Sequence, residues 1–172
     1  FQNLYCFIPC HPDDDNMVEY VEQMISHPRV TGVKLHCHVQ QIYPHDKRLF
    51  PVYEMLIEKK KRILLHVGTG PQTNEFVGFE HFKKLLKVFP ELPAIVAHMG
   101  GYEFKKFINL LDEYDGLYFD TAYCFFPGTP WFFDLGKEYL ETHKNNILYG
   151  SDFPNMISPR EIELEYLLGL DL

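Results

Sequence analysis

Six short apolar segments recur along the chain, and most of them end at or just before a polar residue. Their starts lie mostly about 30 residues apart, which is the size of a βαβ unit. Helix-like spacing of apolar residues follows each of the first five segments. We therefore predict alternating strands and helices, with the strands at Leu4–Pro9, Gly32–His36, Ile63–Val67, Ala94–His98, Leu117–Thr121 and Ile147–Gly150.

The strand segments show little polar alternation. The stretch "AIVAH" at 94–98 is typical of a parallel strand that is buried on both faces. No linker or low-complexity tract interrupts the chain, so residues 1–172 are predicted to form a single domain. Two helix features are also predicted: Asp15 caps the first helix, and a later helix runs from Trp131 to His143.

Two α/β architectures are compatible with this alternation. A doubly wound sheet usually carries a glycine-rich phosphate loop after its first strand, and the sequence has neither GxGxxG nor GxxxxGK[ST]. A (β/α)8 barrel instead collects functional residues from the C-terminal ends of several strands. We therefore predict an α/β fold of the (β/α)8 TIM-barrel type. The polar residues at the predicted strand ends are Lys34, His36, His66, His98, Asp120 and Asp152.

Composition narrows the kinds of partner. The formal net charge of −8 argues against a general nucleic-acid binder, and no apolar run approaches the roughly 20 residues that span a bilayer. The four cysteines include no CxxC pair, which favours a reducing, cytoplasmic compartment. We expect a small-molecule substrate, and we expect neither nucleic acid nor membrane as a partner. The sequence leaves open whether the chain forms a homo-oligomer.

His66 and His98 are the main candidates for chemistry, because each stands at a strand end before a glycine-containing turn. A single such histidine is usually a core imidazole or a capping group, but two on successive strands of a barrel would point into the same mouth. Asp152, just past the last predicted strand, would alone be read as a turn residue. Together the three are ligand types that zinc and related divalent metals prefer.

Lys34 and the pair His36 and His38 are weaker candidates. Lys34 faces opposite to Val33 and Leu35, so it is either a snorkelling surface residue or a group at the barrel mouth. At the mouth it could bind a substrate carboxylate or help to hold metal. His36 and His38 have the ligand-like HxH spacing, but His38 is expected to lie beyond the strand.

Aromatic residues that follow the strands could line a pocket for a flat substrate, or they could pack in the core and between helices. The stretch "YCFFPGTP" at 123–130 is the best candidate for a substrate loop, because its glycine and prolines break regular structure. The aromatic candidates are Tyr43, Tyr102, Tyr123, Phe125, Phe126 and Trp131.

Five motifs, "GVKLHCH", "ILLHVGTG", "AIVAHMGG", "LYFDTAY" and "ILYGSDFP", resemble in this order the strand 4 to strand 8 signatures of the amidohydrolase superfamily. The most similar branch is amidohydrolase-2, which includes aminocarboxymuconate-semialdehyde decarboxylase. The resemblance implies that His66 ligates a metal and that Asp152 binds metal and orients or deprotonates its water. It implies a second-metal ligand or an acid/base group at His98, and it matches Lys34 to a lysine that is carboxylated in binuclear members.

The superfamily also carries a metal-binding HxH on its first strand, and no such motif precedes "NLYCFIPC" in this sequence. The six predicted strands match strands 3 to 8, and 172 residues fall short of the about 250 that are typical of the barrel. We therefore expect an incomplete barrel. This chain alone should bind metal weakly and be inactive, whereas the intact protein should be an enzyme.

Three functions are compatible with these residues. The first is a metal-dependent hydrolase, most simply with zinc, in which metal-activated water attacks a carbonyl at a C–N or C–O bond. Asp152 would take the proton, and His98 would stabilise the oxyanion or protonate the leaving group. The second is a non-oxidative decarboxylase of an aromatic or enol-type carboxylic acid. The third is an inactive remnant or interaction module that keeps the fold and lacks two ligands.

Overall fold

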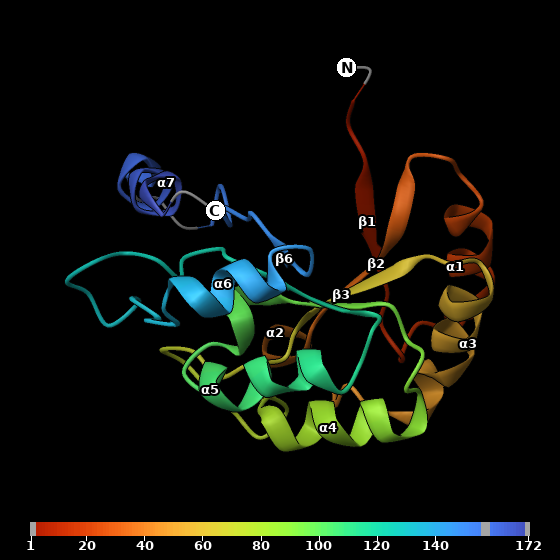
Figure 1. The fold of residues 1–172 in the computed structure, drawn as a ribbon. Coiled ribbons are helices and arrows are strands. Elements are labelled where there is room, and N and C mark those ends of the chain that lie inside the picture. The colour runs from red at the N-terminus through yellow and green to blue at the C-terminus, as the bar shows by residue number, and fades with distance from the viewer. Residues whose placement is uncertain (1–2, 156–158, 171–172) are drawn as a thin grey trace.

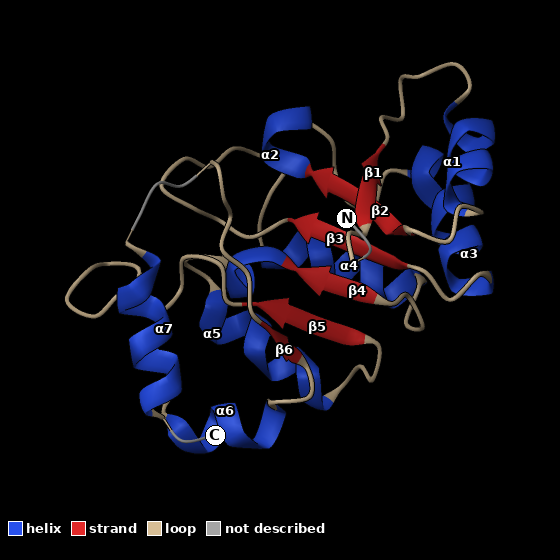
Figure 2. Ribbon diagram, turned by 90° about the horizontal axis from the view of Figure 1, so that it is seen from above, coloured by secondary structure: helices blue, strands red, loops and turns tan. Residues whose placement is uncertain are grey.

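A single parallel sheet organises the protein. The computed structural model describes residues 3–155 and 159–170. Within them the sheet has the order β1-β2-β3-β4-β5-β6, and each strand is parallel to its neighbours. Sequential order and parallel pairing confirm the predicted α/β fold (Figure 2). The strands are β1 (Cys6–Pro9), β2 (Val30–His36), β3 (Arg62–His66), β4 (Ala94–Val96), β5 (Leu117–Asp120) and β6 (Ile147–Leu148).

Helices follow the strands in turn and surround one side of the sheet. Figure 1 shows α1, α3, α4 and α5 one after another around the outside of the sheet, while α7 lies apart from them. The helices are α1 (Met17–Ile25), α2 (Cys37–Gln40), α3 (Phe50–Glu58), α4 (Phe79–Val88), α5 (Phe104–Phe107), α6 (Lys137–His143) and α7 (Arg160–Gly169). Short 3-10 turns occur at η1 (Lys47–Leu49), η2 (Ala97–Gly100) and η3 (Ile108–Asp112).

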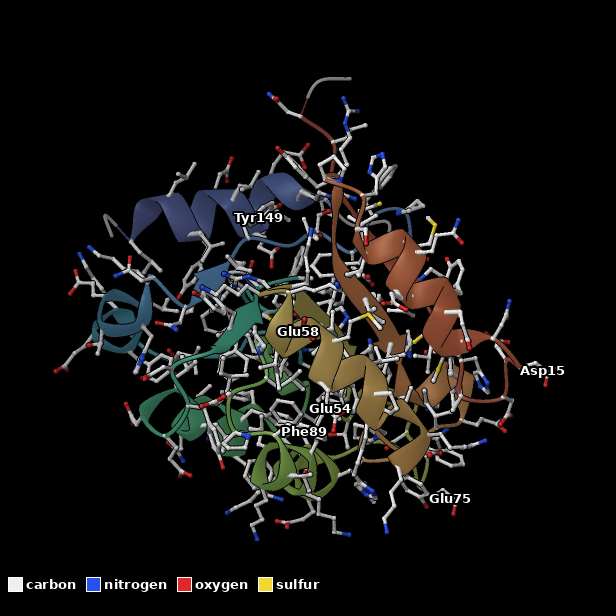
Figure 3. The ribbon with its side chains drawn as sticks, turned by 90° about the vertical axis from the view of Figure 1, so that its right-hand side faces the viewer. Asp15, Glu54, Glu58, Glu75, Phe89 and Tyr149 are labelled. Carbon is white, nitrogen blue, oxygen red and sulfur yellow. The ribbon has the colours of Figure 1, made fainter. Side chains whose placement is uncertain are left out.

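The core lies between the sheet and this outer layer of helices. Val33 and Leu35 of β2 are fully buried on the face that the helices cover. In α3, Val52 and Leu56 are buried one turn apart, whereas Glu54 and Glu58 are exposed (Figure 3). Burying an apolar side chain of this size contributes about 1.5–3 kcal/mol, so the packing of α3 on the sheet stabilises the fold. An amphipathic helix on each connection is what the 3.6-residue apolar spacing predicts.

The opposite face of the sheet is more polar and less buried. The register places Lys34 beside Leu64, and Leu64 beside Ile95. Both Lys34 and Leu64 are partly exposed, although Ile95 is buried. In a (β/α)8 barrel this would be the inward face, and a sheet with helices on one face only is the expected form of a partial barrel.

Several predicted boundaries are wrong. Asn16 rather than Asp15 caps α1, and its side chain makes no capping hydrogen bond. The predicted helix from Trp131 to His143 begins only at Lys137, because residues 123–133 form a small hairpin and Gly136 enters α6 with φ of +73°. The hairpin joins Phe125 to Phe132 in an antiparallel bridge.

Two general features bear on the setting of the chain. No helix within the described ranges is long and apolar enough to cross a membrane. All four cysteines are free thiols; Cys6 is exposed, and Cys10, Cys37 and Cys124 are buried.

Candidate active site

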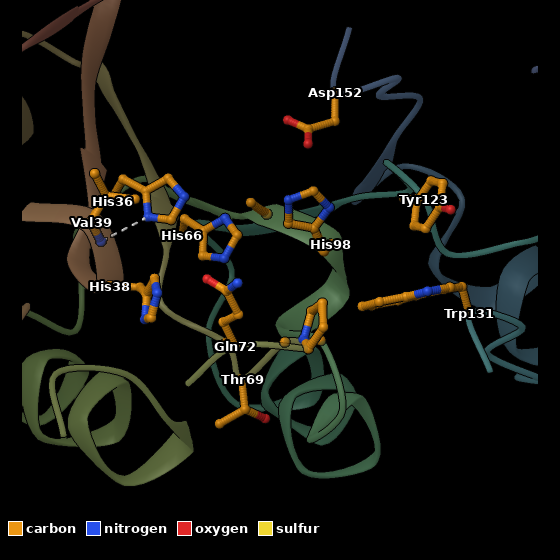
Figure 4. A pocket seen from close by; sticks show the side chains of 15 residues that line it. His36, His38, Val39, His66, Thr69, Gln72, His98, Tyr123, Trp131 and Asp152 are labelled. Atoms are coloured by element: carbon orange, nitrogen blue, oxygen red, sulfur yellow. Dashed lines mark hydrogen bonds between the residues drawn. The ribbon is translucent and has the colours of Figure 1, made fainter. Parts of the chain in front are cut away.

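A cavity of about 310 Å³ opens at the C-terminal end of the strands. Three predicted site residues, His66, His98 and Asp152, line it together. Figure 4 shows His36, His66 and His98 in a row, with Asp152 to one side of the row. Residues from β2, from β3 and from the turns after β4 and β6 therefore meet at one point, as the barrel prediction requires.

His66 ends β3, and its position follows from the strand register. Because His36 and His66 are paired across β2 and β3, their rings stack with centroids 3.8 Å apart and planes 12° apart. The His98 ring meets His66 edge to face at 4.9 Å. Burial, followed by the positive charge that His36, His98 and Lys34 can carry, lowers the pKa of His66 to about 2. His66 is therefore a neutral imidazole near pH 7, with a nitrogen lone pair available.

His36 and His38 both line the cavity, although they were the weaker candidates in the sequence. The Nδ1 atom of His36 accepts a hydrogen bond from the backbone N–H of Val39 at 3.4 Å and so caps α2. Burial lowers the pKa of His36 to about 4. The Nδ1 atom of His38 is buried without a hydrogen-bond partner within the described structure. The HxH spacing of His36 and His38 was the sequence signal for this pair. The structure brings both to the cavity because the helix α2, which follows His36, turns His38 back toward it.

His98 is held in an unusual backbone conformation. The strand β4 ends at Val96, and His98 adopts φ of +54° and ψ of 32°, which few residues other than glycine do. Its backbone N–H donates to Asp120 Oδ1 at 2.9 Å. Its Nδ1 atom lies 2.7 Å from the carbonyl oxygen of Ala122. Because a carbonyl only accepts, Nδ1 carries the hydrogen, and in the neutral ring Nε2 keeps its lone pair.

The glycines after His66 and His98 bring the two turns into backbone contact. A Cβ atom at Gly101, where φ is +63°, would lie 1.8 Å from the carbonyl oxygen of Thr69. A Cβ atom at Gly68 would lie 2.2 Å from the carbonyl carbon of Gly100. Only glycine allows this approach, which draws together the two turns that carry the histidines.

The other predicted residues differ in their relation to the cavity. Asp152 has φ of +51°, and its carboxylate reaches the cavity from the turn after β6. Lys34 does not line the cavity; it lies on the same face of β2 as His36, two residues earlier. Asp120 accepts hydrogen bonds from the backbone N–H groups of His98 and Ala122 through Oδ1, and burial raises its pKa.

Neutral imidazoles are suited to metal binding, because a ligating histidine must be deprotonated. Across residues 3–155 and 159–170, however, no three His, Cys, Asp or Glu side chains converge closely enough to hold an ion. A catalytic zinc site usually has three protein ligands. The described side chains therefore do not by themselves include such a set of three, and metal binding by His66, His98, Asp152 and Lys34 stays a prediction.

Tyr123 and Trp131 form an aromatic wall of the cavity. The Trp131 ring stacks on Tyr102 at 5.1 Å and meets Tyr123 edge to face at 5.3 Å. Other aromatic candidates do not line the cavity: Tyr43 packs against His45, and Phe125 and Phe126 are buried. Of the predicted substrate loop at 123–130, only Tyr123 lines the cavity, and Trp131 follows the loop directly. The role of this loop in substrate binding stays a prediction.

The fold is that of a partial (β/α)8 barrel, with the strand-end histidines at a cavity beside the C-terminal ends of its strands. A family model with the description Amidohydrolase, from the amidohydrolase-2 group, matches residues 4–172, and the chain belongs to this family. No curated protein matches the sequence.

Solved structures share the fold at low sequence identity. An uncharacterised TIM-barrel protein from Bordetella bronchiseptica is 16% identical with a TM-score of 0.66, over 96% of this chain and 66% of that one. A 5-carboxyvanillate decarboxylase from Novosphingobium aromaticivorans, with manganese and 3-methoxy-4-hydroxy-5-nitrobenzoic acid bound, is 12% identical with a TM-score of 0.62, over 92% and 57%. A dihydroorotase from Campylobacter jejuni is 16% identical with a TM-score of 0.56, over 86% and 49%. The chain thus spans less than two thirds of the length of each.

Proposed function

We propose that the intact protein is a metal-dependent hydrolase that cleaves a C–N or C–O bond of a small, planar carbonyl substrate. The observation that carries the proposal is the hydrogen bond from His98 Nδ1 to the carbonyl oxygen of Ala122. It leaves Nε2 as a base inside a cavity that also contains His66 and Asp152. Membership of the amidohydrolase family supports hydrolysis as the reaction.

His98 has the geometry of an acid/base group. In the neutral ring, Nε2 can take a proton from an attacking water, and the Ala122 carbonyl then stabilises the imidazolium through Nδ1–H. The same proton can pass to the leaving group as the bond to the carbonyl carbon breaks. The Asp152 carboxylate is a second base at the cavity and can orient the water or compensate the imidazolium charge.

We further propose that the intact protein holds a divalent ion, zinc or manganese, with His66 as one ligand. The low pKa of His66 supports this role, because its nitrogen does not have to lose a proton first. The remaining ligands would come from parts of the intact protein that this chain does not provide. The four free thiols support a reducing, cytoplasmic location as part of the same proposal.

A second candidate is non-oxidative decarboxylation of an aromatic carboxylic acid. The aromatic wall of Tyr123 and Trp131 favours a flat ring as substrate, and a relative of the same fold has a benzoic acid bound. In this reaction the bond to the carboxylate carbon breaks, CO2 leaves, and a protonated His98 Nε2 donates its proton to the ring carbon. The step consumes one proton and releases one CO2.

The test is turnover by the intact, metal-supplied protein on matched amides, lactones and 2-hydroxybenzoate-type acids. Hydrolysis predicts product without CO2, whereas decarboxylation predicts one CO2 per substrate consumed. A His27→Gln variant is the matched control for substitutions of His98, because His27 is an exposed histidine outside the cavity. It should turn over substrate like wild type. An intact, metal-loaded protein that turns over no member of any class would overturn both proposals and favour an inactive remnant.

A further inference from the structure

Glu163 is a buried carboxylate that the proposed chemistry does not use. It is 1% exposed, and Thr121 is the other buried polar residue in the described structure. Burial raises the pKa of Glu163, whereas hydrogen bonds from two backbone N–H groups favour its charged form. A carboxylate is buried at such a cost only where donors compensate it, so its partners are informative.

Both partners of Glu163 belong to the 123–133 hairpin. The Oε1 atom accepts hydrogen bonds from the backbone N–H of Cys124 at 3.2 Å and of Phe125 at 3.3 Å. Bonds from amides to a carboxylate are charge-assisted and therefore stronger than bonds between neutral groups. The Cys124 N–H also donates to the Thr121 carbonyl oxygen at 2.9 Å, so Glu163 is one of two acceptors for this amide. The helix α7 thus contacts the start of the hairpin through a single oxygen atom.

A second contact from α7 reaches the same hairpin. Tyr166, three residues after Glu163, stacks on Phe125 at 5.7 Å and meets Phe132 edge to face at 5.1 Å. Residues three apart on a helix share one face, so Glu163 and Tyr166 contact the hairpin from the same face of α7. Within the hairpin, Phe133 N donates to the Cys124 carbonyl at 2.8 Å and closes its base.

The hairpin carries two residues that line the cavity, and a third group that shapes the cavity directly precedes it. Ala122, directly before it, supplies the carbonyl that accepts from His98 Nδ1. Tyr123, the residue before Cys124, has φ of +60° and lines the cavity. Trp131 lines the cavity from the returning arm, where its carbonyl accepts from Phe126 N at 3.3 Å. The bonds to Glu163 thus lie one and two residues beyond Tyr123.

We propose that Glu163 is a positioning residue: it fixes the hairpin so that Tyr123 and Trp131 wall the cavity and Ala122 orients His98. The inference concerns a residue outside the cavity, and it rests on the proposed function only for its effect on turnover. Removing this oxygen takes the acceptor from the Phe125 amide and one of two acceptors from the Cys124 amide, so the hairpin loosens and its wall residues are expected to move.

The sequence contains its own reporter, because Trp131 is the sole tryptophan. Glu163→Ala is expected to shift the Trp131 emission to the red and to raise its acrylamide quenching constant by at least about twofold, since the partly exposed indole loses its packing on Tyr102 and Tyr123. Glu163→Gln should stay near wild type, because its amide oxygen still accepts both N–H groups. Glu163→Asp should behave like Glu163→Ala, because its shorter side chain does not reach.

Two controls separate positioning from a general loss of stability. Glu161→Gln changes an exposed carboxyl on the same helix and should leave the Trp131 emission unchanged. Leu167→Ala removes a partly buried side chain of α7 and should lower the Tm without exposing Trp131. The proposal is overturned if Glu163→Ala leaves the Trp131 signal at the wild-type value, or if Leu167→Ala exposes Trp131 to the same degree at an equal loss of Tm.

The same variants give a second readout in the intact protein. Glu163→Ala should raise KM and lower kcat, and Glu163→Gln should restore both, whereas a purely structural role would lower the amount of active protein at constant KM. The emission measurement needs no substrate, so it decides the role of Glu163 even if the proposed reaction is wrong. Unchanged KM in Glu163→Ala, with an altered Trp131 signal, would contradict the link between the hairpin and the substrate.

Discussion

His98 and Ala122 are joined twice at the cavity. The Nδ1 atom of His98 donates to the Ala122 carbonyl at 2.7 Å, and the backbone N–H groups of both residues donate to Asp120 Oδ1 at 2.9 and 3.1 Å. The Asp120 carboxylate at the end of β5 therefore fixes the backbone of His98 in the turn after β4. The Ala122 carbonyl, two residues after Asp120, fixes the His98 imidazole. The orientation of Nε2 is thus set before any substrate arrives.

We predict that His98→Asn lowers kcat/KM of the intact protein by about 10²–10⁴-fold, the usual contribution of a general acid/base group. Asparagine tolerates the positive φ of this position and can still donate to the Ala122 carbonyl, so the Tm should stay close to wild type. His98→Ala should lose activity and also stability. Full activity of a folded His98→Asn variant would contradict the role of Nε2.

Gly101→Ala should destabilise the protein strongly. The new Cβ would lie 1.8 Å from the Thr69 carbonyl oxygen at a position where φ is +63°, so the two turns must separate. A loss of about 3 kcal/mol or more in the free energy of unfolding is expected, from the steric and the backbone cost together. Urea denaturation measures this loss.

The matched control for this prediction is Gly128→Ala. Gly128 has a similar φ of +78°, but a Cβ atom at this position would have no atom within 4 Å, so only the backbone cost of about 1–2 kcal/mol applies. Equal losses in the two variants would show that the contact between the turns contributes nothing.

Acid should weaken the fold through its histidines. Burial lowers the pKa of His36 to about 4 and that of His66 to about 2, whereas an unfolded histidine titrates near 6.5. Below pH 6.5 the unfolded chain binds protons that the folded chain does not. The free energy of unfolding therefore falls as the pH drops, by at most about 1.4 kcal/mol per pH unit for each group.

A His36→Asn variant isolates this effect, because asparagine can still cap α2 while removing one titrating ring. The loss of stability between pH 7 and pH 5, measured by urea denaturation, should be smaller in the variant than in wild type. The raised pKa values of Asp120 and Glu163 act in the opposite direction but are common to both proteins. An equal loss in the two proteins would exclude His36 as a source.

The 172-residue chain alone should not retain one equivalent of zinc or manganese after dialysis against metal-free buffer. Its described side chains include no three converging ligands, and two ligands bind too weakly to withstand dialysis. Metal content by mass spectrometry measures this, and His66→Ala should lower any residual content further. One tightly held equivalent of zinc or manganese on this chain would contradict the prediction that it lacks metal ligands.

The strand-end residues were accessible to sequence reasoning because their positions follow from local rules. Apolar segments at regular spacing predicted parallel strands, and the ends of parallel strands meet at one side of the sheet. His66, His98 and Asp152 accordingly reach one cavity. The left-handed turn at His98 was not predictable, because it depends on the bond to Asp120 from the next strand.

The hairpin and Glu163 were beyond the same reasoning. Trp131, Phe132 and Phe133 have apolar character that fits a helix as well as a hairpin. In the structure Phe132 contacts Tyr166 of α7 and bridges to Phe125, and both contacts lie far away in the sequence or across the turn. Glu163 is an acidic residue among others in "REIELEYLLG", and its amide partners lie 38 and 39 positions earlier in the chain. Periodicity carries no information about such a pairing.

The close approach of Gly68 to Gly100, and of Gly101 to Thr69, constrains how this protein can vary among its homologues. A side chain added at either turn requires the other turn to withdraw, and withdrawal would separate His66 from His98. Substitutions at these positions should therefore be rare alone and appear jointly, accompanied by a change in the distance between the two imidazoles. Correlated variation across homologous sequences should mark the two glycine turns as one inherited unit.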